Sequence, residues 1–222
     1  MYKSLATVAA LTSAYMADTV EARWSFGSCP KVENVSDFDP ARYSGQWYEI
    51  VRDRQNPYTL STDCVTKEFA PYNEQDKSMD LYFRGYYMWR FGYMGASGTM
   101  YQCDEGSADS FTCMATMGRS PKRSPFPIWA TDYDNYDIGY SCTDHLGGRV
   151  KFEMFSVASR TPEMSDEVMA QVSQIIEEKI PHYNLDKARG LYWTKQNGWC
   201  EYSWKWAAES ETPSDSTGKF LL

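Results

Sequence analysis

The sequence DFDPARYSGQWYEI, at residues 37–50, leads directly into the start of an aromatic strand. Gly45 permits close backbone packing, and Trp47 carries a ring large enough to close the base of a barrel. Strand-forming residues continue as far as Arg52, so a first strand is expected near Gln46–Arg52. This stretch therefore predicts where a β-structure begins.

The chain between Gly45 and Arg160 repeats one pattern. Short segments rich in Tyr, Phe, Trp, Val and Thr alternate with clusters of Gly, Pro, Asn, Asp and Ser, which is typical of a meandering sheet. The loops at 134–135 and 146–148 contain residues that tolerate positive φ, as tight hairpins require. Eight antiparallel strands close a small up-and-down barrel. We expect these strands, lettered A to H in chain order, near Gln46–Arg52, Cys64–Tyr72, Met79–Trp89, Gly98–Cys103, Phe111–Met117, Phe126–Tyr133, Asp137–Thr143 and Arg149–Ala158.

Before Arg160 apolar residues recur at every second position, whereas after it they recur at every third or fourth position. Pro162 suits the first turn of a helix and Pro181 ends the run, so one helix is expected to pack outside the barrel. The polar segment after Trp206 has no period and is expected to be a disordered tail at 207–222. The apolar stripe of the helix consists of Met164, Val168, Val172, Ile175, Ile176 and Ile180.

The N-terminus predicts the compartment. A short cationic start precedes an apolar stretch from Leu5 to Ala17 that is too short for a bilayer span, so residues 1–22 are read as a signal peptide and 23–206 as one secreted, extracellular domain. The sequon at Asn34 permits glycosylation in that compartment.

The net charge of the chain, -8, opposes nucleic acid as a partner. With His145 and His182 the only histidines and no Cys-x-x-Cys, a metal site is not expected.

Three motifs in order carry a family resemblance. The run at 37–50 resembles the Gly-x-Trp motif of the lipocalin family, in its apolipoprotein D and insect bilin-binding branch. The segment WATDYDNY at 129–136, with Thr131, Asp132 and Tyr133, resembles that branch's motif between strands F and G, and Tyr140-Ser141-Cys142 continues it. Arg160, in SRTP at 159–162, resembles the arginine that lies across the strand A tryptophan, so it is expected to stack on Trp47. All three motifs imply structural roles at the closed end of the barrel.

The resemblance also implies disulfide pairs. Six cysteines in a secreted chain are expected to pair, and six allow fifteen connectivities. In this branch the N-terminal cysteine joins strand G and the strand B cysteine joins the C-terminal segment, which implies Cys29–Cys142 and Cys64–Cys200. Cys103 and Cys113 remain, on neighbouring strands across one hairpin, where a third bridge on the outer surface is geometrically plausible.

The alternation of side chains along each strand predicts the ligand pocket. On strand F the resemblance puts Ala130 inside and Trp129 outside, and on strand H it puts Ser156 and Ala158 inside. Leu81, Gly85 and Trp89 should face inward on strand C, and Gln102 and Thr116 on strands D and E. Small residues there leave volume for a cavity. The residues expected to contact a ligand are Phe83, Tyr87, Met100, Met114, Phe126, Ile128 and Met154.

The expected function is a non-catalytic carrier of a small hydrophobic ligand: a bilin, retinoid, carotenoid, fatty acid or steroid. No cofactor is required, no transmembrane span is expected, and a cell-surface receptor is a further candidate partner. Two alternatives remain open. One is a lipocalin-fold enzyme, against which the even cysteine set and the absence of catalytic motifs argue. The other is an interaction scaffold that presents exposed aromatic residues such as Trp193 and Trp199.

Overall fold

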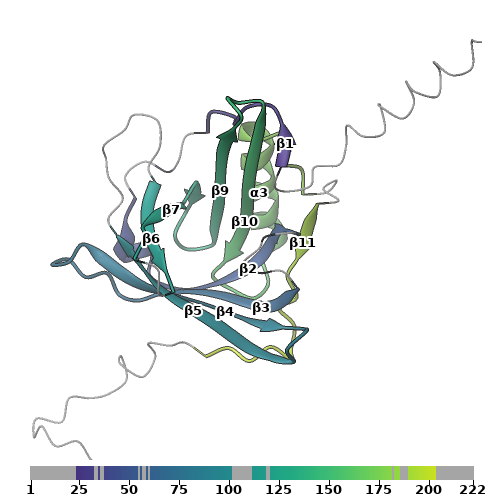
Figure 1. Cartoon of the computed structure of the whole chain (residues 1–222). Coiled ribbons are helices and arrows are strands. Elements are labelled where there is room, and N and C mark those ends of the chain that lie inside the picture. The colour runs from purple at the N-terminus through teal and green to yellow at the C-terminus, as the bar shows by residue number, and fades with distance from the viewer. Residues whose placement is uncertain are drawn as a thin grey trace, which may run out of the picture.

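The computed structural model describes residues 24–32, 35, 38–54, 56, 59, 61–101, 112–118, 121–181, 183–185 and 190–203. Figure 1 shows a strongly curled antiparallel sheet with one long helix against its outer side. The strands are β1 Trp24–Phe26, β2 Gly45–Asp53, β3 Thr62–Phe69, β4 Ser78–Tyr87, β5 Gly92–Tyr101, β6 Thr112–Met117, β7 Ser124–Pro127, β8 Ala130–Thr131, β9 Tyr136–His145, β10 Val150–Ser159 and β11 Leu191–Trp193. The helices are α2 Pro40–Tyr43 and α3 Asp166–Lys179.

The sheet follows the order of the chain. Its main path is β7-β6-β5-β4-β3-β2-β10-β9-β8, with β1 beside β10 and β11 beside β2. The two ends of this path, β7 and β8, belong to one segment that is interrupted only at Ile128 and Trp129. Counted as one strand, they complete eight consecutive strands whose two outer edges meet in a single segment. The predicted all-β, eight-stranded antiparallel architecture is confirmed.

The sixth expected strand, Phe126–Tyr133, is therefore two short strands. Pro125 and Pro127 have no backbone N–H and cannot donate to a neighbouring strand, which limits pairing in this segment. The ladder resumes where Trp129 N donates to Ile138 O at 2.9 Å. Another difference is that β5 begins at Gly92, six residues before the expected start at Gly98, and pairs along its whole length with β4.

Helix α3 covers the outer face of β9 and β10, as the sequence predicted (Figure 1). Its buried residues Val172 and Ile176 pack with Phe155 and Val157 of β10. The N-terminus differs from the prediction, because Ser165 is the N-cap and accepts a hydrogen bond from Val168 N at 3.4 Å. Pro162 therefore lies before the helix and not in its first turn.

Two disulfides fix the ends of the chain to the sheet. Cys29–Cys142 joins the N-terminal segment to β9, and Cys64–Cys200 joins β3 to the C-terminal segment. Both are the pairs that the family resemblance implied. Cys103, Asn34, residues 1–22 and residues 207–222 lie outside the described residues, and the side chain of Cys113 is not described either. The third bridge, the glycosylation site, the signal peptide and the tail therefore remain predictions.

Candidate functional site: a cavity inside the barrel

The closed end of the barrel is built on Trp47, which is 0% exposed. Its indole N–H donates to Tyr43 O at 2.9 Å, and the guanidinium carbon of Arg160 lies 3.7 Å from its ring centroid. Gly45 has a φ of 102°, and a Cβ there would lie 3.1 Å from Arg160 Nη1. A glycine at 45 thus gives both the backbone conformation and the space that the arginine needs. Tyr43, Phe69 and Leu81 complete a buried floor around the tryptophan.

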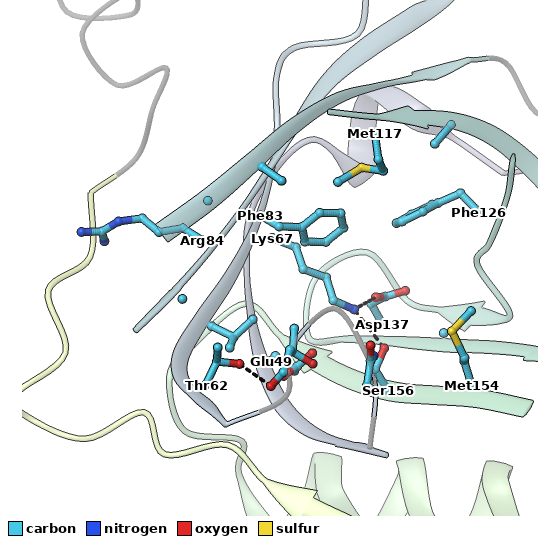
Figure 2. Close-up of a pocket in the computed structure, with 18 of the residues that line it drawn as sticks. Glu49, Thr62, Lys67, Phe83, Arg84, Met117, Phe126, Asp137, Met154 and Ser156 are labelled. Carbon is cyan, nitrogen blue, oxygen red and sulfur yellow. Dashed lines mark hydrogen bonds and ion pairs between the residues drawn. The ribbon is translucent and has the colours of Figure 1, made fainter. Parts of the chain in front are cut away.

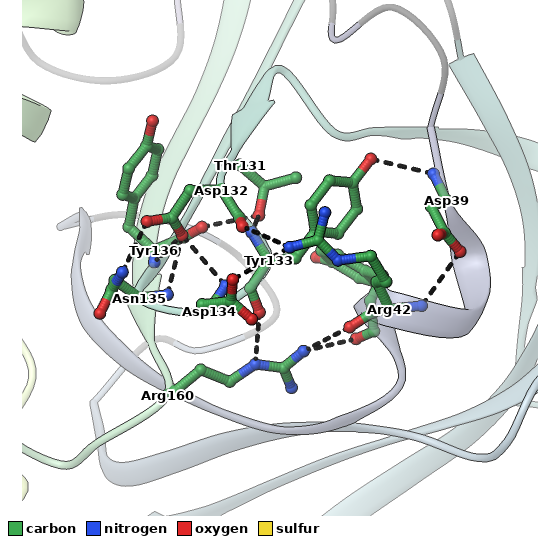
Figure 3. A network of polar contacts seen from close by, with 10 residues as sticks. Asp39, Arg42, Thr131, Asp132, Tyr133, Asp134, Asn135, Tyr136 and Arg160 are labelled. Carbon is green, nitrogen blue, oxygen red and sulfur yellow. Dashed lines mark hydrogen bonds and ion pairs between the residues drawn. The ribbon is translucent and has the colours of Figure 1, made fainter.

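Arg160 also ties three chain segments together (Figure 3). Its guanidinium donates to the carbonyl oxygens of Tyr133 at 2.9 Å, Arg42 at 2.9 Å and Gln46 at 3.2 Å. It therefore joins helix α2, strand β2 and the turn between β8 and β9, in addition to its stacking on Trp47. Trp47 and Arg160 thus lie in contact at the closed end of the barrel, where the resemblance placed them.

Asp132 organises that turn (Figure 3). Its Oδ1 accepts hydrogen bonds from the backbone N–H groups of Asp134, Asn135 and Tyr136, and its Oδ2 accepts one from the Asn135 side chain. Burial raises the cost of ionising Asp132, but these hydrogen bonds outweigh it and lower its pKa below the usual value of an aspartate. Thr131 adds a bond from its Oγ1 to Tyr136 O at 2.7 Å.

We expect Asp132→Ala to lower the free energy of unfolding at pH 7, and we expect this loss to shrink as the solution becomes acidic. A carboxyl with a lowered folded-state pKa stabilises the fold above its unfolded pKa, about 3.9, and the contribution disappears as pH falls through the folded-state value. Urea unfolding of both proteins from pH 7 to pH 2.5 measures this. Asp134→Ala, which breaks only an exposed ion pair with Arg42, is the control with little effect. A loss for Asp132→Ala that is the same at every pH would contradict the expectation.

Above the floor lies a cavity of about 510 Å³ (Figure 2). Phe83 and Tyr87 of β4, Phe126 of β7 and Met154 of β10 line it, as expected from the sequence. Gly85 and Ser156 also line it, so two of the small residues expected to leave room are at its wall. Met100 and Ile128 are buried in the floor cluster and do not line the cavity.

Met114 was expected inside the barrel, and that expectation is wrong. Across the β5–β6 pair, Met100 lies opposite Ala115 and Tyr101 lies opposite Met114. Directly opposed residues share a face of the sheet, so the face of Met100 carries Ala115 and Met117. Both of these line the cavity. The prediction was one residue out of register along β6, and it therefore also misplaced Thr116. The inward Met114 was the basis for placing Cys113 outside, so that basis no longer holds.

Two further inward assignments are wrong. Ala130 pairs with Ile138 and packs against the outer cluster, the buried apolar residues between α3 and the sheet that include Phe155 and Val172. It faces outward because the break at 128–129 interrupts the alternation of strand F. Trp89 lies beyond the end of β4 and is 59% exposed. Trp129 lies on the outer side of the barrel, the side expected for it, and is buried in the outer cluster.

The sequence interpretation missed the charged groups of the cavity. Lys67 of β3 extends its amino group to 3.5 Å from Asp137 Oδ2 and 3.1 Å from Ser156 Oγ, two side chains of the opposite wall (Figure 2). Lys67 is 8% exposed and Asp137 2%. Burial raises the pKa of Asp137, and the charge of Lys67 and the hydroxyl of Tyr43 oppose that rise. Applying the same alternation to β3 and β9, starting from Phe69 and Ile138, would have found both residues.

Glu49 also lines the cavity, and the charge of its carboxylate is neutralised by Arg52. The ladder with β10 pairs Glu49 with Ala158 and Val51 with Val157, so Ile50 is an extra residue in β2. This bulge brings Glu49 and Arg52 to the same side although they are three positions apart. Their side chains meet at 2.6 Å, and Thr194 donates to the same carboxylate at 3.0 Å.

Among the described residues, no group of three or more His, Cys, Asp or Glu side chains is arranged to hold a metal ion. In the same part of the chain, no helix has the length and apolar character needed to cross a membrane.

Comparison with known proteins agrees with this architecture. Residues 99–195 match the model of the lipocalin / cytosolic fatty-acid binding protein family. Bilin-binding protein of Pieris brassicae is 26% identical over 151 residues, 68% of this chain and 76% of that protein. Apolipoprotein D of Cavia porcellus is 29% identical over 126 residues, 54% of this chain and 59% of that protein.

Solved structures show the same fold. Insecticyanin of the tobacco hornworm Manduca sexta superposes with a TM-score of 0.67 at 20% identity, over 82% of this chain and 94% of that one. Lobster apocrustacyanin A1 superposes with a TM-score of 0.64 at 20% identity, over 83% and 97%. These two structures support the fold, and the family model, the two relatives and the geometry of Trp47 and Arg160 support the lipocalin family, in the branch similar to bilin-binding protein and apolipoprotein D.

Proposed function

We propose that this protein is a secreted carrier that binds a small hydrophobic molecule inside its barrel. The observation that carries the proposal is the cavity of about 510 Å³, whose mainly apolar walls include Phe83, Phe126, Met117 and Met154. Ligand pockets have volumes of about 300–1,000 Å³ and apolar walls with a few polar groups. A relative of this chain is named bilin-binding protein, which supports a ligand-binding function for the present protein as well.

Secretion is supported by the apolar N-terminal segment and by two disulfides, which form in oxidising compartments. Bilins, retinoids, carotenoids, fatty acids and steroids are the candidate ligands. The proposal is of a binding protein and not an enzyme, so the ligand should leave the barrel chemically unchanged.

Extraction of the protein purified from its natural source tests this proposal. We expect mass spectrometry and an absorption spectrum to find about one lipophilic molecule per chain. The apoprotein should then bind the purified molecule again, with quenching of tryptophan fluorescence, and should release it unaltered after prolonged incubation. Conversion of that molecule during incubation would indicate an enzyme. An empty barrel that also fails to bind any of the five candidate classes would indicate a scaffold.

A further inference from the structure

The charged pair Lys67–Asp137 lies in the deep part of the cavity, just above the floor. In the strand ladders Lys67 is directly opposite Trp47 on one side and Phe83 on the other. Asp137 is directly opposite Ala158, another floor residue. The pair therefore spans the barrel where the deep end of a bound molecule would lie, and Figure 2 shows the lysine amino group between Asp137 and Ser156.

The fold gains little from this pair. Removing two charges from water is costly, and well-packed apolar side chains of similar volume usually serve stability as well or better. The distance of 3.5 Å between Lys67 Nζ and Asp137 Oδ2 exceeds the roughly 2.7–2.9 Å of a strong charge-assisted hydrogen bond. A weakly joined ion pair at the wall of an apolar cavity is thus better explained by what enters the cavity.

The pair offers hydrogen-bond donors to a ligand. An ammonium group has three N–H donors, and two partners of Lys67 are seen among the described residues, Asp137 and Ser156. The Ser156 hydroxyl, which accepts from Lys67, also has a proton to donate. An oxygen atom of a ligand placed beside these groups would receive up to two hydrogen bonds.

Charge balance decides which kind of oxygen fits. Lys67 and Asp137 neutralise each other, Glu49 is neutralised by Arg52, and the guanidinium of Arg84 is turned away onto the ring of Tyr93 at 3.8 Å (Figure 2). Among the described residues that line the cavity, the charges facing inward therefore cancel. A buried carboxylate would add an uncompensated negative charge in an apolar space, whereas a carbonyl or hydroxyl would not.

We infer that Ser156 and Lys67, whose amino group Asp137 holds in place, bind an uncharged oxygen, a carbonyl or a hydroxyl, at the deep end of the ligand. The inference rests on the proposed carrier function and narrows its ligand class. It disfavours fatty acids that enter with the carboxylate first, and it favours alcohols, aldehydes and ketones with an extended apolar body.

Three probes with one carbon skeleton test the inference: retinol, retinoic acid and the corresponding hydrocarbon without the terminal oxygen. Binding to the apoprotein is measured at pH 7.5 by quenching of tryptophan fluorescence. We expect retinol to bind at least about 10-fold more tightly than either of the other two, the effect of one hydrogen bond to a charged group.

The double variant Lys67→Met/Asp137→Asn removes both charges and keeps the side chains close to their original size. We expect the preference for retinol to fall below about 3-fold, with the hydrocarbon bound at least as tightly as before. The control is Arg42→Met/Asp134→Asn, which removes a 2.9 Å ion pair between two residues that do not line the cavity and should leave all three affinities unchanged. Retained hydrocarbon binding shows that the double variant is folded.

The outcomes separate the two proposals. If the three probes bind equally well, or if the double variant keeps its preference for retinol, the inference about the polar anchor is wrong while the carrier function stands. Tighter binding of retinoic acid than of retinol would also overturn it. If none of the probes binds, and no lipophilic molecule is extracted from the native protein, both proposals fail.

Discussion

Replacing Trp47 with alanine should lower the free energy of unfolding by about 3–5 kcal/mol, the usual cost of removing a large buried aromatic side chain. The ring is 0% exposed and lies 5.2 Å from the Tyr43 ring, and the Arg160 guanidinium covers it. Urea unfolding followed by far-ultraviolet circular dichroism measures the change without using tryptophan fluorescence.

Two further substitutions serve as comparisons for the Trp47→Ala measurement. Arg160→Ala should cost about 1–3 kcal/mol, because it removes the stacked cation and its hydrogen bonds but leaves the floor packed. Trp193→Ala removes a tryptophan that is 47% exposed and should cost less than about 1 kcal/mol. Folded Trp47→Ala protein should keep the ligand selectivity of the parent, since the ring lies below the cavity. A changed ligand spectrum with an unaltered free energy of unfolding would contradict the placement of Trp47 at the closed end.

Replacing Met117 with arginine should weaken binding of the native ligand by on the order of 100-fold or more. The Met117 side chain lies in the cavity wall near Phe83 and Phe126 (Figure 2). A guanidinium there would have to lose its hydration or displace the ligand, and either carries a free-energy cost of several kcal/mol. The measurement is a fluorescence titration of the apoprotein with the molecule extracted from the native protein.

Met114→Arg is the matched control, because the same residue type is changed three positions earlier on the same strand. Met114 lies opposite Tyr101 and does not line the cavity. The affinity of the Met114→Arg variant for the ligand should therefore stay within about 3-fold of that of the parent protein. Circular dichroism confirms that both variants are folded. If Met114→Arg abolishes binding while Met117→Arg preserves it, the register of β6 in the structure is wrong by one residue.

The sequence by itself determined the eight strands of the barrel, their antiparallel order and the outer helix, but not the short strands β1 and β11 or the division of one strand into β7 and β8. These depend on local features: turn residues recur at short intervals, and the apolar period changes once, after Arg160. The motifs around Trp47, Asp132 and Arg160 indicated the closed end and the two disulfides that the structure contains. A family resemblance can supply such features because they hold the framework and do not depend on the ligand.

Only the tertiary structure decided which residues of β6 face the cavity. On β6 both alternating sets are compatible with an interior position, Met114 with Thr116 and Ala115 with Met117, so the sequence cannot choose between them. The choice is made by pairing with β5, where Met100 lies opposite Ala115.

Alternation can place Lys67 and Asp137 on the inner faces of their strands, but only the tertiary structure shows that the two side chains meet. Lys67 and Asp137 are 70 positions apart and meet because β3 and β9 lie on facing walls of the barrel. Glu49 and Arg52 share one side of β2 because of an extra residue at Ile50. Alternation along one strand carries information about two faces only, whereas contacts across a barrel and the effect of a bulge depend on how the strands pair.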